Sequence, residues 1–456
     1  MLSDTISAIA TPIGGEGGIG VVRISGPSSL NIIKTIFRPS LEGDFSSYKL
    51  RHGWVVDNLY SLDEALVSYM AAPKSYTGED VIEISCHGGP AVLKQVLALT
   101  IKVGARLAER GEFTKRAFLN GRLDLAQAEA VINLVKAKTR EGSLLAASQL
   151  KGSLSSKINS TRDGLLKLLA EIEASVDFPD EVDDIKAAEL ISVLNKSIVD
   201  INGLLDTADA GIIYRDGISI AIIGKPNVGK SSLLNALLRE DRAIVTDEPG
   251  TTRDTIEETL NIKGIPARVI DTAGIRHSTS MIEKIGVDRA LTALNKADLV
   301  LLVVDISQKL SAEDTRLFDA SRNSKVIIAL NKSDRPHILT IDSFKKDMGI
   351  LSPVIKLSAL TGNGIPELES AIYDSVIDNK VVAESTDIMI NLRHKQCLIR
   401  AKENIVKAAG SVNSSIQPDL VSIDIRDAVS ALGEVTGEAV SDEIIDRIFE
   451  EFCVGK

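Results

Sequence analysis

The 456-residue chain is poor in cysteine, histidine and aromatic residues, and each shortage excludes a class of function. The three cysteines, Cys86, Cys397 and Cys453, are too few and too widely spaced for a disulfide framework. They and the five histidines show no Cys-x-x-Cys or His-x-x-x-His spacing, which argues against a structural zinc site. Aromatic residues make up 4% of the chain, so we do not expect a stacking surface for single-stranded nucleic acid.

The sequence also has little excess positive charge and no long apolar run. Lys and Arg number 52 against 63 Asp and Glu, a net charge of −11, which excludes a generally basic surface but not a local basic groove. The longest apolar stretch, 299–304, is far shorter than the ~20 residues that cross a bilayer. Asp4 stands where a signal peptide would carry basic residues. We therefore expect a cytoplasmic protein without a membrane anchor.

The pattern of apolar residues divides the chain into four segments. Residues 1–118 combine strand and helix patterns, which indicates an α+β domain. Residues 119–215 carry apolar residues at helical spacing, and residues 377–456 do so again. Alternating strand and helix patterns over 216–376 predict an α/β domain with a mostly parallel sheet. The predicted fold class is multidomain α/β, in which a discontinuous α-helical domain is interrupted by the inserted α/β domain.

Individual elements are predicted within these segments. In the first segment we expect strands at 20–25 and 80–85 and a helix at 91–102. In the second segment the spacing predicts helices over 123–138, 144–159, 161–176 and 185–207, and a change of pattern over 211–217.

A phosphate-binding loop is the strongest motif. It follows a predicted strand at 218–223, opens a predicted helix at 232–238, and contains Gly224, Lys225, Pro226, Asn227, Val228, Gly229, Lys230, Ser231 and Ser232. The glycines allow backbone N–H groups to face phosphates, and Lys230 supplies positive charge at the β and γ oxygens. The hydroxyl of Ser231 can bind Mg²⁺.

Further segments predict that the nucleotide is GTP. After the strand at 326–330 come Asn331, Lys332 and Asp334. A carboxylate at Asp334 can accept the N1 and N2 hydrogens of guanine, which adenine does not offer. Two further segments follow two other strands. A loop that could lie against the base contains Ser358, Ala359 and Leu360. A segment that could hold the Mg²⁺ shell and sense the γ-phosphate contains Asp271, Thr272, Ala273 and Gly274.

The segment between the phosphate-binding loop and Asp271 resembles a nucleotide switch. It contains Thr246, Asp247, Glu248, Pro249, Gly250, Thr251 and Thr252. A threonine in such a segment completes Mg²⁺ coordination in the triphosphate state. Thr252 is our candidate, and Thr251 is the alternative.

Hydrolysis needs a group that orients water, and the usual group is absent. Ile275 stands where Ras-like enzymes carry a glutamine. The domain is therefore either a slow switch or draws charge and water positioning from elsewhere. The side chain of Asn227 could bind a monovalent cation beside the phosphates, or Asn227 could be only a turn residue. Glu283 could position water through a relay, or could be a surface helix residue.

Segments outside the nucleotide motifs carry a resemblance to a known family. Over its full length the chain resembles MnmE (TrmE), the tRNA-modifying GTPases. The segments that carry the resemblance are 9–12, 22–26, 76–80, 111–113, 116–120, 123–130 and 452–456.

The resemblance implies both an activity and partners. Family members work with an FAD-containing partner, MnmG (GidA), in a heterotetramer or larger complex. They add a carboxymethylaminomethyl or aminomethyl group to C5 of the wobble uridine (position 34) of certain tRNAs. The one-carbon unit comes from 5-formyl-tetrahydrofolate or a related folate bound by the N-terminal domain, which also forms a homodimer. GTP hydrolysis depends on K⁺ and on dimerisation of the G domains.

The resemblance also implies roles for particular residues. K⁺ would be bound by Asn227, Thr246, Glu248 and Thr251, and Mg²⁺ by Ser231 and Thr252. Glu283 would position water, with Arg276 and Thr252 as further catalytic residues. The folate pocket would use Arg23, Glu83, Arg122 and Lys456, which requires the segment ending at Lys456 to fold back towards the N-terminal domain.

Two alternatives stay open. Cys453 could be a nucleophile for C6 of uridine, or a packed or pocket-lining residue between the apolar Phe452 and Val454. The chain could instead be a GTP-dependent ribosome-assembly or switch protein. Such a protein would be expected to carry an RNA-binding KH domain with a basic Gly-x-x-Gly loop, and the nearest segment here, 14–17, is acidic.

Overall fold

The computed structural model describes residues 4–13, 17–58, 60–178, 180, 186–240, 259–270, 294, 296–348, 352–377, 388–414 and 418–456. The chain forms two compact units, each built from separate stretches of sequence. The first unit contains residues 1–132, 150–193 and 403–456, and the second contains 133–149 and 194–402.

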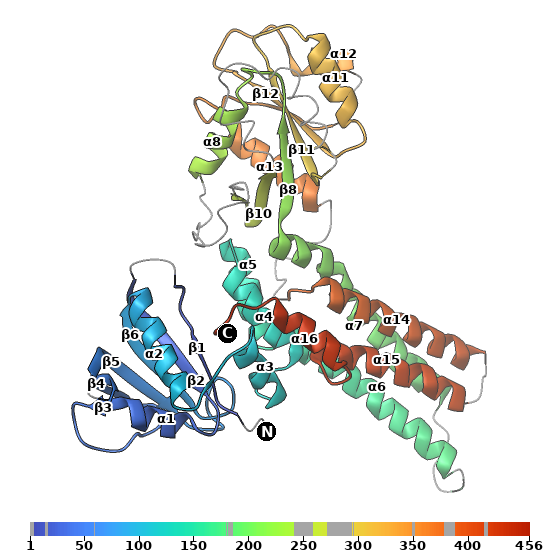
Figure 1. Cartoon of the computed structure of the whole chain (residues 1–456). Coiled ribbons are helices and arrows are strands. Elements are labelled where there is room, and N and C mark those ends of the chain that lie inside the picture. The colour runs from blue at the N-terminus through green and yellow to red at the C-terminus, as the bar shows by residue number, and fades with distance from the viewer. Residues whose placement is uncertain are drawn as a thin grey trace. The chain divides into compact units, whose positions relative to one another are not determined.

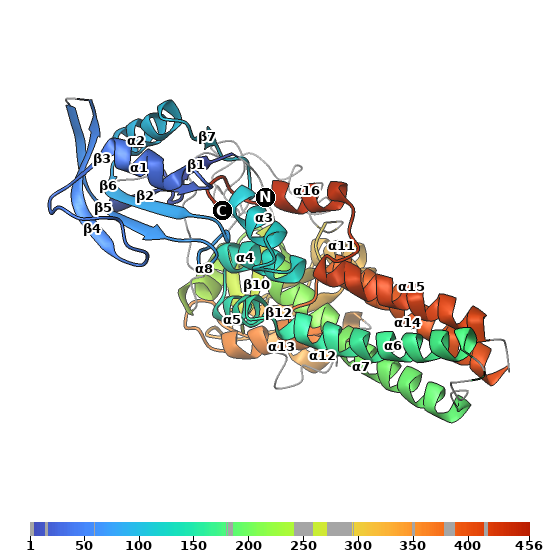
Figure 2. The ribbon, with the colours of Figure 1, turned by 90° about the horizontal axis from the view of Figure 1, so that it is seen from below.

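A seven-stranded sheet forms the N-terminal part of the first unit, with strand order β3-β4-β5-β6-β2-β1-β7 (Figures 1 and 2). Neighbouring strands are antiparallel except β1 and β7, which are parallel. The strands are β1 (Ile6–Ile9), β2 (Gly17–Ser25), β3 (Phe37–Pro39), β4 (Leu50–Asp57), β5 (Tyr60–Met70), β6 (Val81–Gly88) and β7 (Arg106–Leu107). The predicted strands at 20–25 and 80–85 are therefore confirmed.

Two amphipathic helices, α1 (Ser29–Ile36) and α2 (Pro90–Lys102), pack on this sheet. Ile32 and Ile36 of α1 and Leu93 and Val96 of α2 are buried in one core with the apolar side chains of the strands. Their spacing of three and four residues places them on one side of each helix, which explains why these segments are helical and which face they bury.

The rest of the first unit is helical. It includes α3 (Glu112–Leu119), most of α4 (Leu125–Lys136), α6 (Ser153–Asp177), α15 (Pro418–Thr436) and α16 (Asp442–Glu450). Helix α6 packs along α15 (Figure 2). Residues of α3, α4 and α16 share a second core that includes Ala117, Ala128 and Phe449. Helix α16, near the end of the chain, therefore packs against the two helices that follow the N-terminal sheet in sequence.

The second unit contains a six-stranded sheet with order β13-β12-β11-β8-β10-β9. All neighbouring pairs are parallel except β9 and β10, so the predicted mostly parallel sheet is observed. The strands are β8 (Ile218–Ile223), β9 (Thr259–Ile262), β10 (Ile265–Ile270), β11 (Leu299–Asp305), β12 (Val326–Asn331) and β13 (Val354–Lys356).

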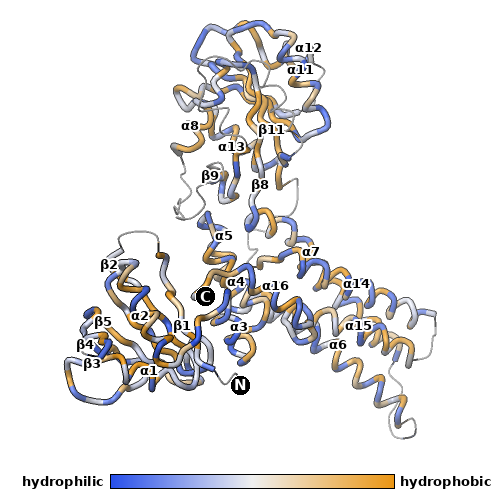
Figure 3. Tube along the Cα trace, in the orientation of Figure 1, coloured by the Kyte–Doolittle hydropathy of each residue, from blue (hydrophilic) through white to orange (hydrophobic). Residues whose placement is uncertain are grey.

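Helices cover both faces of this sheet. Residues of α8 (Lys230–Glu240) and α13 (Ile365–Ile377) join the core on one face, and residues of α11 (Ala312–Ser321) and α12 (Ile341–Met348) join the core on the other. The central strands are accordingly almost continuously apolar, as the tube in Figure 3 shows for β11. The remaining helices are α5 (Arg140–Leu150), α7 (Ala187–Asp216) and α14 (Leu392–Asn413).

Two helix boundaries differ from the prediction. The predicted break at Ser160 is wrong, because the chain turns at 151–152 and α6 runs unbroken through Thr161. The hydroxyl of Thr161 donates to the carbonyl of Lys157, 3.2 Å away, so this polar residue bonds within the helix and does not end it. Helix α7 continues to Asp216, past the predicted helix end at Thr207 but within the range 211–217 where the pattern was expected to change. In the described part of the chain, no helix has the length and apolar character needed to cross a membrane.

Candidate functional site

The phosphate-binding loop lies between the carboxyl end of β8 and the first turn of α8, as predicted. The backbone at Asn227 is left-handed, with φ +62°, a conformation that asparagine tolerates better than most residues. The backbone carbonyl of Asn227 accepts a hydrogen bond from Lys332 Nζ at 2.7 Å. Asn227 is therefore a turn residue by its backbone, and its role in binding K⁺ through the side chain stays a prediction.

The ammonium of Lys230 is held by its own loop. It donates to the carbonyl oxygens of Gly224 and Lys225, each at 2.7 Å. Burial lowers the pKa of Lys230, and the charge of Glu313 acts in the opposite direction. An ammonium has three N–H donors, and these two bonds use two of them. The predicted role of the third N–H group at a phosphate oxygen stays a prediction.

Asn331 connects the phosphate-binding loop to the predicted base loop. Its Nδ2 donates to the carbonyl of Val228 at 2.8 Å, and its Oδ1 accepts from the backbone N–H of Ala359 at 3.0 Å. The side chain of Asn331 is buried. One amide thus fixes two loops that are more than 100 residues apart in sequence, which is the arrangement needed to hold both ends of a nucleotide.

Lys332 forms an ion pair that the sequence analysis missed. Its Nζ lies 2.7 Å from Oδ2 of Asp305, which is 3% exposed at the end of β11. Burial alone would raise the pKa of Asp305, but hydrogen bonds from Lys332 and Ser307 hold this pKa below its usual value. An acidic residue directly after the apolar run 299–304 was the available signal.

Asp334 is placed and charged as a guanine acceptor requires. Its Oδ1 accepts a hydrogen bond from the Ser358 hydroxyl at 2.6 Å, and this bond lowers the pKa of Asp334. The carboxylate is therefore ionised at neutral pH and is oriented by the loop that contains Ser358 and Ala359. Leu360, in the same loop, is 81% exposed, as expected for an apolar side chain available to a flat ligand.

Several predicted site residues lie outside the described part of the chain. They are Thr246, Asp247, Glu248, Pro249, Gly250, Thr251, Thr252, Asp271, Thr272, Ala273, Gly274, Ile275, Arg276 and Glu283. Of the predicted Mg²⁺ and K⁺ ligands, Ser231 at the start of α8 and Asn227 are within it. No group of three or more His, Cys, Asp or Glu side chains suited to a metal occurs among the described residues.

A second cluster of predicted residues forms in the first unit. Arg23 of β2 and Glu83 of β6 are direct cross-strand partners, and Arg23 Nη2 lies 2.8 Å from Glu83 Oε1. The side chain of Arg23 is 14% exposed. Its Nη1 donates to the carbonyl of Gly455 at 3.4 Å.

The segment ending at Lys456 folds back onto this cluster, as the folate prediction requires. Val454 forms an isolated antiparallel bridge with Arg110, and the N–H of Phe113 donates to the carbonyl of Lys456 at 3.2 Å. Burial lowers the pKa of Lys456, the charge of Arg23 lowers it further, and Glu83 and Cys453 act in the opposite direction. Lys456 therefore lies among the charges of the cluster.

Arg122 approaches the same place through an aromatic ring. Its guanidinium carbon lies 5.0 Å from the centre of the Tyr76 ring, and that of Arg23 lies 5.2 Å from the same centre. Arg23 also lies 5.5 Å from the centre of the Phe113 ring. Neither Tyr76 nor Phe113 has a role predicted from the sequence. Their presence in two of the family-like segments was the only available signal.

The environment of Cys453 differs from one of the two interpretations. Phe452 is buried, but Cys453 is exposed and Val454 is 48% exposed, so the packed interpretation is wrong. The pocket-lining and nucleophilic interpretations both stay predictions, since the thiol influences Lys456 at the edge of the charged cluster.

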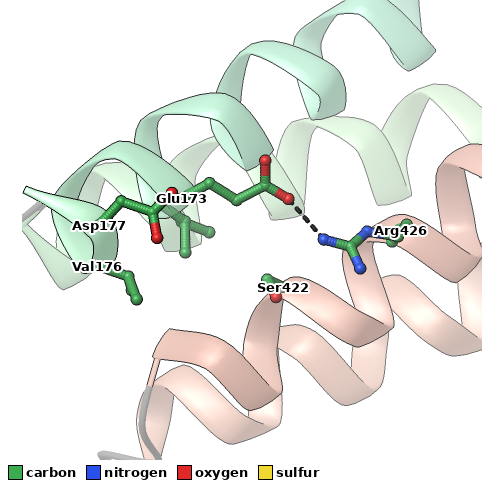
Figure 4. Close-up of a pocket in the computed structure, with 6 residues that line it drawn as sticks. Glu173, Val176, Asp177, Ser422 and Arg426 are labelled. Atoms are coloured by element: carbon green, nitrogen blue, oxygen red, sulfur yellow. Dashed lines mark hydrogen bonds and ion pairs between the residues drawn. The ribbon is translucent and has the colours of Figure 1, made fainter.

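A groove of about 420 Å³ lies between α6 and α15, and no predicted site residue lines it. Figure 4 shows Glu173 of α6 and Arg426 of α15 on its two sides, joined by an ion pair of 2.6 Å. The other lining residues are Ile172, Val176, Asp177 and Ser422. The charges of Glu173 and Arg426 therefore neutralise each other across the groove.

The site in the second unit defines the class of protein. A P-loop nucleotide-binding domain suited to guanine is defined by three features: a mostly parallel sheet, a phosphate-binding loop before a helix, and an Asn-Lys-x-Asp segment beside a serine loop.

Comparison with known proteins identifies the family. Residues 5–122 match the family model "GTP-binding protein TrmE N-terminus", and residues 125–453 match "MnmE helical domain". The protein named tRNA modification GTPase MnmE from Alkaliphilus oremlandii is 48% identical over 463 residues, with 100% of both chains covered. Proteins of the same name from Desulforamulus reducens and Carboxydothermus hydrogenoformans are 47% and 46% identical, again over 100% of both chains. The chain belongs to the MnmE (TrmE) family.

Proposed function

We propose that this protein is a GTP-hydrolysing enzyme that modifies tRNA. With an FAD-containing MnmG (GidA) partner, it adds a carboxymethylaminomethyl or aminomethyl group to C5 of the wobble uridine (position 34). The observation that carries the proposal is the convergence of Lys230, Asn331 and Asp334 on one guanine-nucleotide site. This site occurs in a chain that is similar over its whole length to tRNA modification GTPases.

We propose domains that follow the four segments of the sequence. We assign residues 1–118 to a folate-binding and dimerisation domain, 119–215 and 377–456 to a discontinuous helical domain, and 216–376 to an inserted G domain. The seven-stranded sheet and the six-stranded sheet lie in the first and the last of these. A tRNA substrate and a cytoplasmic location belong to the same proposal.

The residues of the G domain bind and orient GTP. Lys230 donates to phosphate oxygens, Asp334 accepts from the guanine ring, and Asn331 keeps the two loops in register. Ser231 and Thr252 would bind Mg²⁺, and Asn227, Thr246, Glu248 and Thr251 would bind K⁺. When bound, these ions supply positive charge at the phosphates, as an arginine finger does in other GTPases. Glu283 would orient water, and Arg276 would be a further catalytic residue, in place of the glutamine that is missing at Ile275.

The charged cluster of the first unit fits a folate. Arg23 pairs with Glu83, Lys456 lies within electrostatic reach of both, and Arg122 shares the Tyr76 ring with Arg23. A carboxylate can accept the N–H groups of a pteridine, and guanidinium and ammonium groups can hold the carboxylates of a glutamyl tail. The donor set therefore suits 5-formyl-tetrahydrofolate or a related one-carbon folate, which would supply the carbon that is transferred.

The first test compares GTP hydrolysis in KCl and NaCl at equal ionic strength. We expect the full chain to be faster in K⁺ by more than about tenfold, because a cation at the phosphates replaces an arginine finger. Asn227→Ala should lose this stimulation. Asn323→Ala, at an exposed position of the same domain, is the matched control and should keep it. Equal slow rates in both salts would contradict the proposal and favour a switch protein.

The modification itself is tested by mass spectrometry of nucleosides. Unmodified tRNA is incubated with the full chain, the flavoprotein partner, GTP, the one-carbon folate, and glycine or ammonium. The expected product is a C5-substituted wobble uridine that requires both proteins. An unchanged uridine under conditions of active GTP hydrolysis would show that hydrolysis serves another purpose.

A further inference from the structure

We infer that Tyr76 is a positioning residue, whose ring holds the guanidinium groups of Arg23 and Arg122 in the arrangement that binds an anionic pteridine-type ligand. The inference rests on the proposed folate site and adds to it a residue for which neither the motifs nor the comparisons specify a role. Tyr76 lies in the connection between β5 and β6, and not in any of the elements that carry the charges.

The ring is the feature that the two arginines share. The guanidinium carbons of Arg23 and Arg122 lie 5.2 and 5.0 Å from its centre, within the ~6 Å over which an aromatic face attracts a cation. The two arginines come from β2 and from the residues after α3, about 100 positions apart. Tyr76 therefore sets the spacing between two charges that no backbone element connects.

Arg122 depends on this contact more than Arg23 does. Arg23 is already oriented by Glu83, with Nε and Nη2 at 2.9 and 2.8 Å from the same carboxylate oxygen. Arg122 is exposed, and within the described ranges its side chain forms no ion pair. Without the ring, a free guanidinium would sample many rotamers, and ordering it on binding would cost affinity.

The ring is itself held in place. The Tyr76 hydroxyl lies 2.9 Å from the Thr114 hydroxyl of α3, and Thr114 is fully buried. On either side of Tyr76, Ser75 donates to the carbonyl of Glu79, and the buried Thr77 hydroxyl lies 2.7 Å from that of Ser25. A side chain anchored at its tip and flanked by anchored neighbours can fix the position of the groups above it.

The test measures the affinity of the full chain for 5-formyl-tetrahydrofolate by calorimetry. Tyr76→Phe retains the ring and should bind within about threefold of the wild type. Tyr76→Leu removes the ring and should bind about tenfold more weakly or worse, the effect expected from losing one to two cation–π contacts. Tyr60→Leu is the matched control, because Tyr60 is 77% exposed in the same sheet, and it should bind as the wild type does.

A graded series separates positioning from packing. Fluorinated phenylalanines at position 76 withdraw electron density from the ring face with little change in shape. Affinity should fall with each added fluorine if the ring holds the arginines by its electrostatics. The fluorescence of Trp54, the single tryptophan, would report whether Tyr76→Leu folds. If that variant fails to fold, the fluorinated series still tests whether the ring holds the arginines. No dependence on fluorination would overturn the inference, and so would equal losses for Tyr76→Phe and Tyr76→Leu.

Arg23→Ala distinguishes failure of the inference from failure of the proposed site. If Arg23→Ala binds the folate as tightly as the wild type, the proposed site is wrong and the inference is lost with it. If Arg23→Ala loses binding while Tyr76→Leu retains it, the folate site stands and Tyr76 has no positioning role.

Discussion

At the scale of single residues, the first unit contains a buried ionic network around Arg116. The side chain of Arg116 is fully buried and contacts carboxylates of Asp4 and Glu112 at 2.9 Å and of Glu79 at 3.2 Å. Arg106 joins the network through Asp4 and Glu112, each at 2.6 Å. Removing one partner from such a network leaves a buried charge uncompensated, which is costly.

This network predicts a specific loss of stability in acid. Burial alone would raise the pKa of Glu112, but hydrogen bonds from Arg106, the Glu109 backbone and Arg116 lower it below the ordinary 4.5. Hydrogen bonds from Arg106 likewise lower the pKa of Asp4 below 3.8. A lowered folded-state pKa contributes stability above the unfolded-state value, and this stability is lost as the pH falls through the folded-state value. We expect the sheet, followed by Trp54 fluorescence, to lose stability below about pH 4.5.

Glu112→Gln isolates this contribution. At pH 7 it should lower the stability of the Trp54-reported transition by about 2–3 kcal/mol, because two arginines lose a charged acceptor. The difference from the wild type should shrink as the pH falls, since the wild-type carboxylate becomes neutral as well. Glu42→Gln, at an exposed position, should change neither the stability nor its pH dependence. A difference that stays constant down to pH 3 would rule out the ionic explanation.

The predictability of the candidate sites also depends on single residues. Lys230, Asn331 and Asp334 stand in contiguous motifs beside strands, so their residue types and spacing were sufficient to predict a guanine site. Asp305 and Tyr76 could not be assigned in this way. Their roles depend on side-chain contacts, with Lys332 and with the two arginines, that arise only when distant elements fold together.

At the scale of elements, helix and strand types were predictable and some boundaries were not. Apolar spacing identified the strands at 218–223 and 326–330 of the six-stranded sheet, because buried parallel strands are almost wholly apolar. In the mostly antiparallel seven-stranded sheet it identified the strands at 20–25 and 80–85, and the other strands were not predicted. The helices of residues 119–215 were harder, since Ser160 and Thr161 resemble a break by residue type. In the structure Thr161 bonds back to Lys157, so the helix continues.

In the sequence, the β9–β10 hairpin lies between the predicted switch segment, 246–252, and the segment predicted to sense the γ-phosphate, 271–274. Its turn is Lys263–Gly264, with φ +48° and +91°. A Cβ at Gly264 would lie 2.6 Å from Cγ of Glu141 in α5. One carboxylate oxygen of Glu141 is buried and forms no hydrogen bond with the described residues. The turn is therefore closely packed against a helix from the preceding segment of the sequence.

Gly264→Ala should loosen this hairpin. The left-handed backbone costs alanine about 1–2 kcal/mol, and the close approach to Glu141 adds to this cost. We expect faster hydrogen–deuterium exchange in peptides covering 259–270. Gly362→Ala is the control for backbone strain alone, because φ is +81° and no atom lies within 4 Å of its added Cβ. Adding Glu141→Ala to Gly264→Ala should remove the part of the faster exchange that exceeds the effect of backbone strain. If Glu141→Ala leaves the exchange rate of Gly264→Ala unchanged, the packing argument is wrong.

At the scale of the whole chain, the first and last segments of the sequence meet within the first unit. Gly455 lies against β1, with φ +96°, and an added Cβ would be 2.3 Å from the carbonyl oxygen of Ile9. The neighbouring Lys456 accepts from the N–H of Phe113. The cluster of residues 23, 83, 122 and 456 therefore draws on both the first and the last segments of the sequence.

Gly455→Ala should detach the last segment and leave the sheet intact. Alanine would meet both an unfavourable φ and the Ile9 carbonyl, so Lys456 would leave the cluster with Arg23 and Glu83. We expect faster removal of Lys456 by a carboxypeptidase and at least about tenfold weaker folate binding, which is the loss expected when one charged contact is removed. The melting transition reported by Trp54 should change little, since the core of the sheet does not include Gly455. Gly410→Ala, where an added Cβ meets open space in α14, should leave all three measurements unchanged. Wild-type folate binding combined with faster carboxypeptidase cleavage would show that Lys456 docks on the cluster but contributes nothing to the ligand.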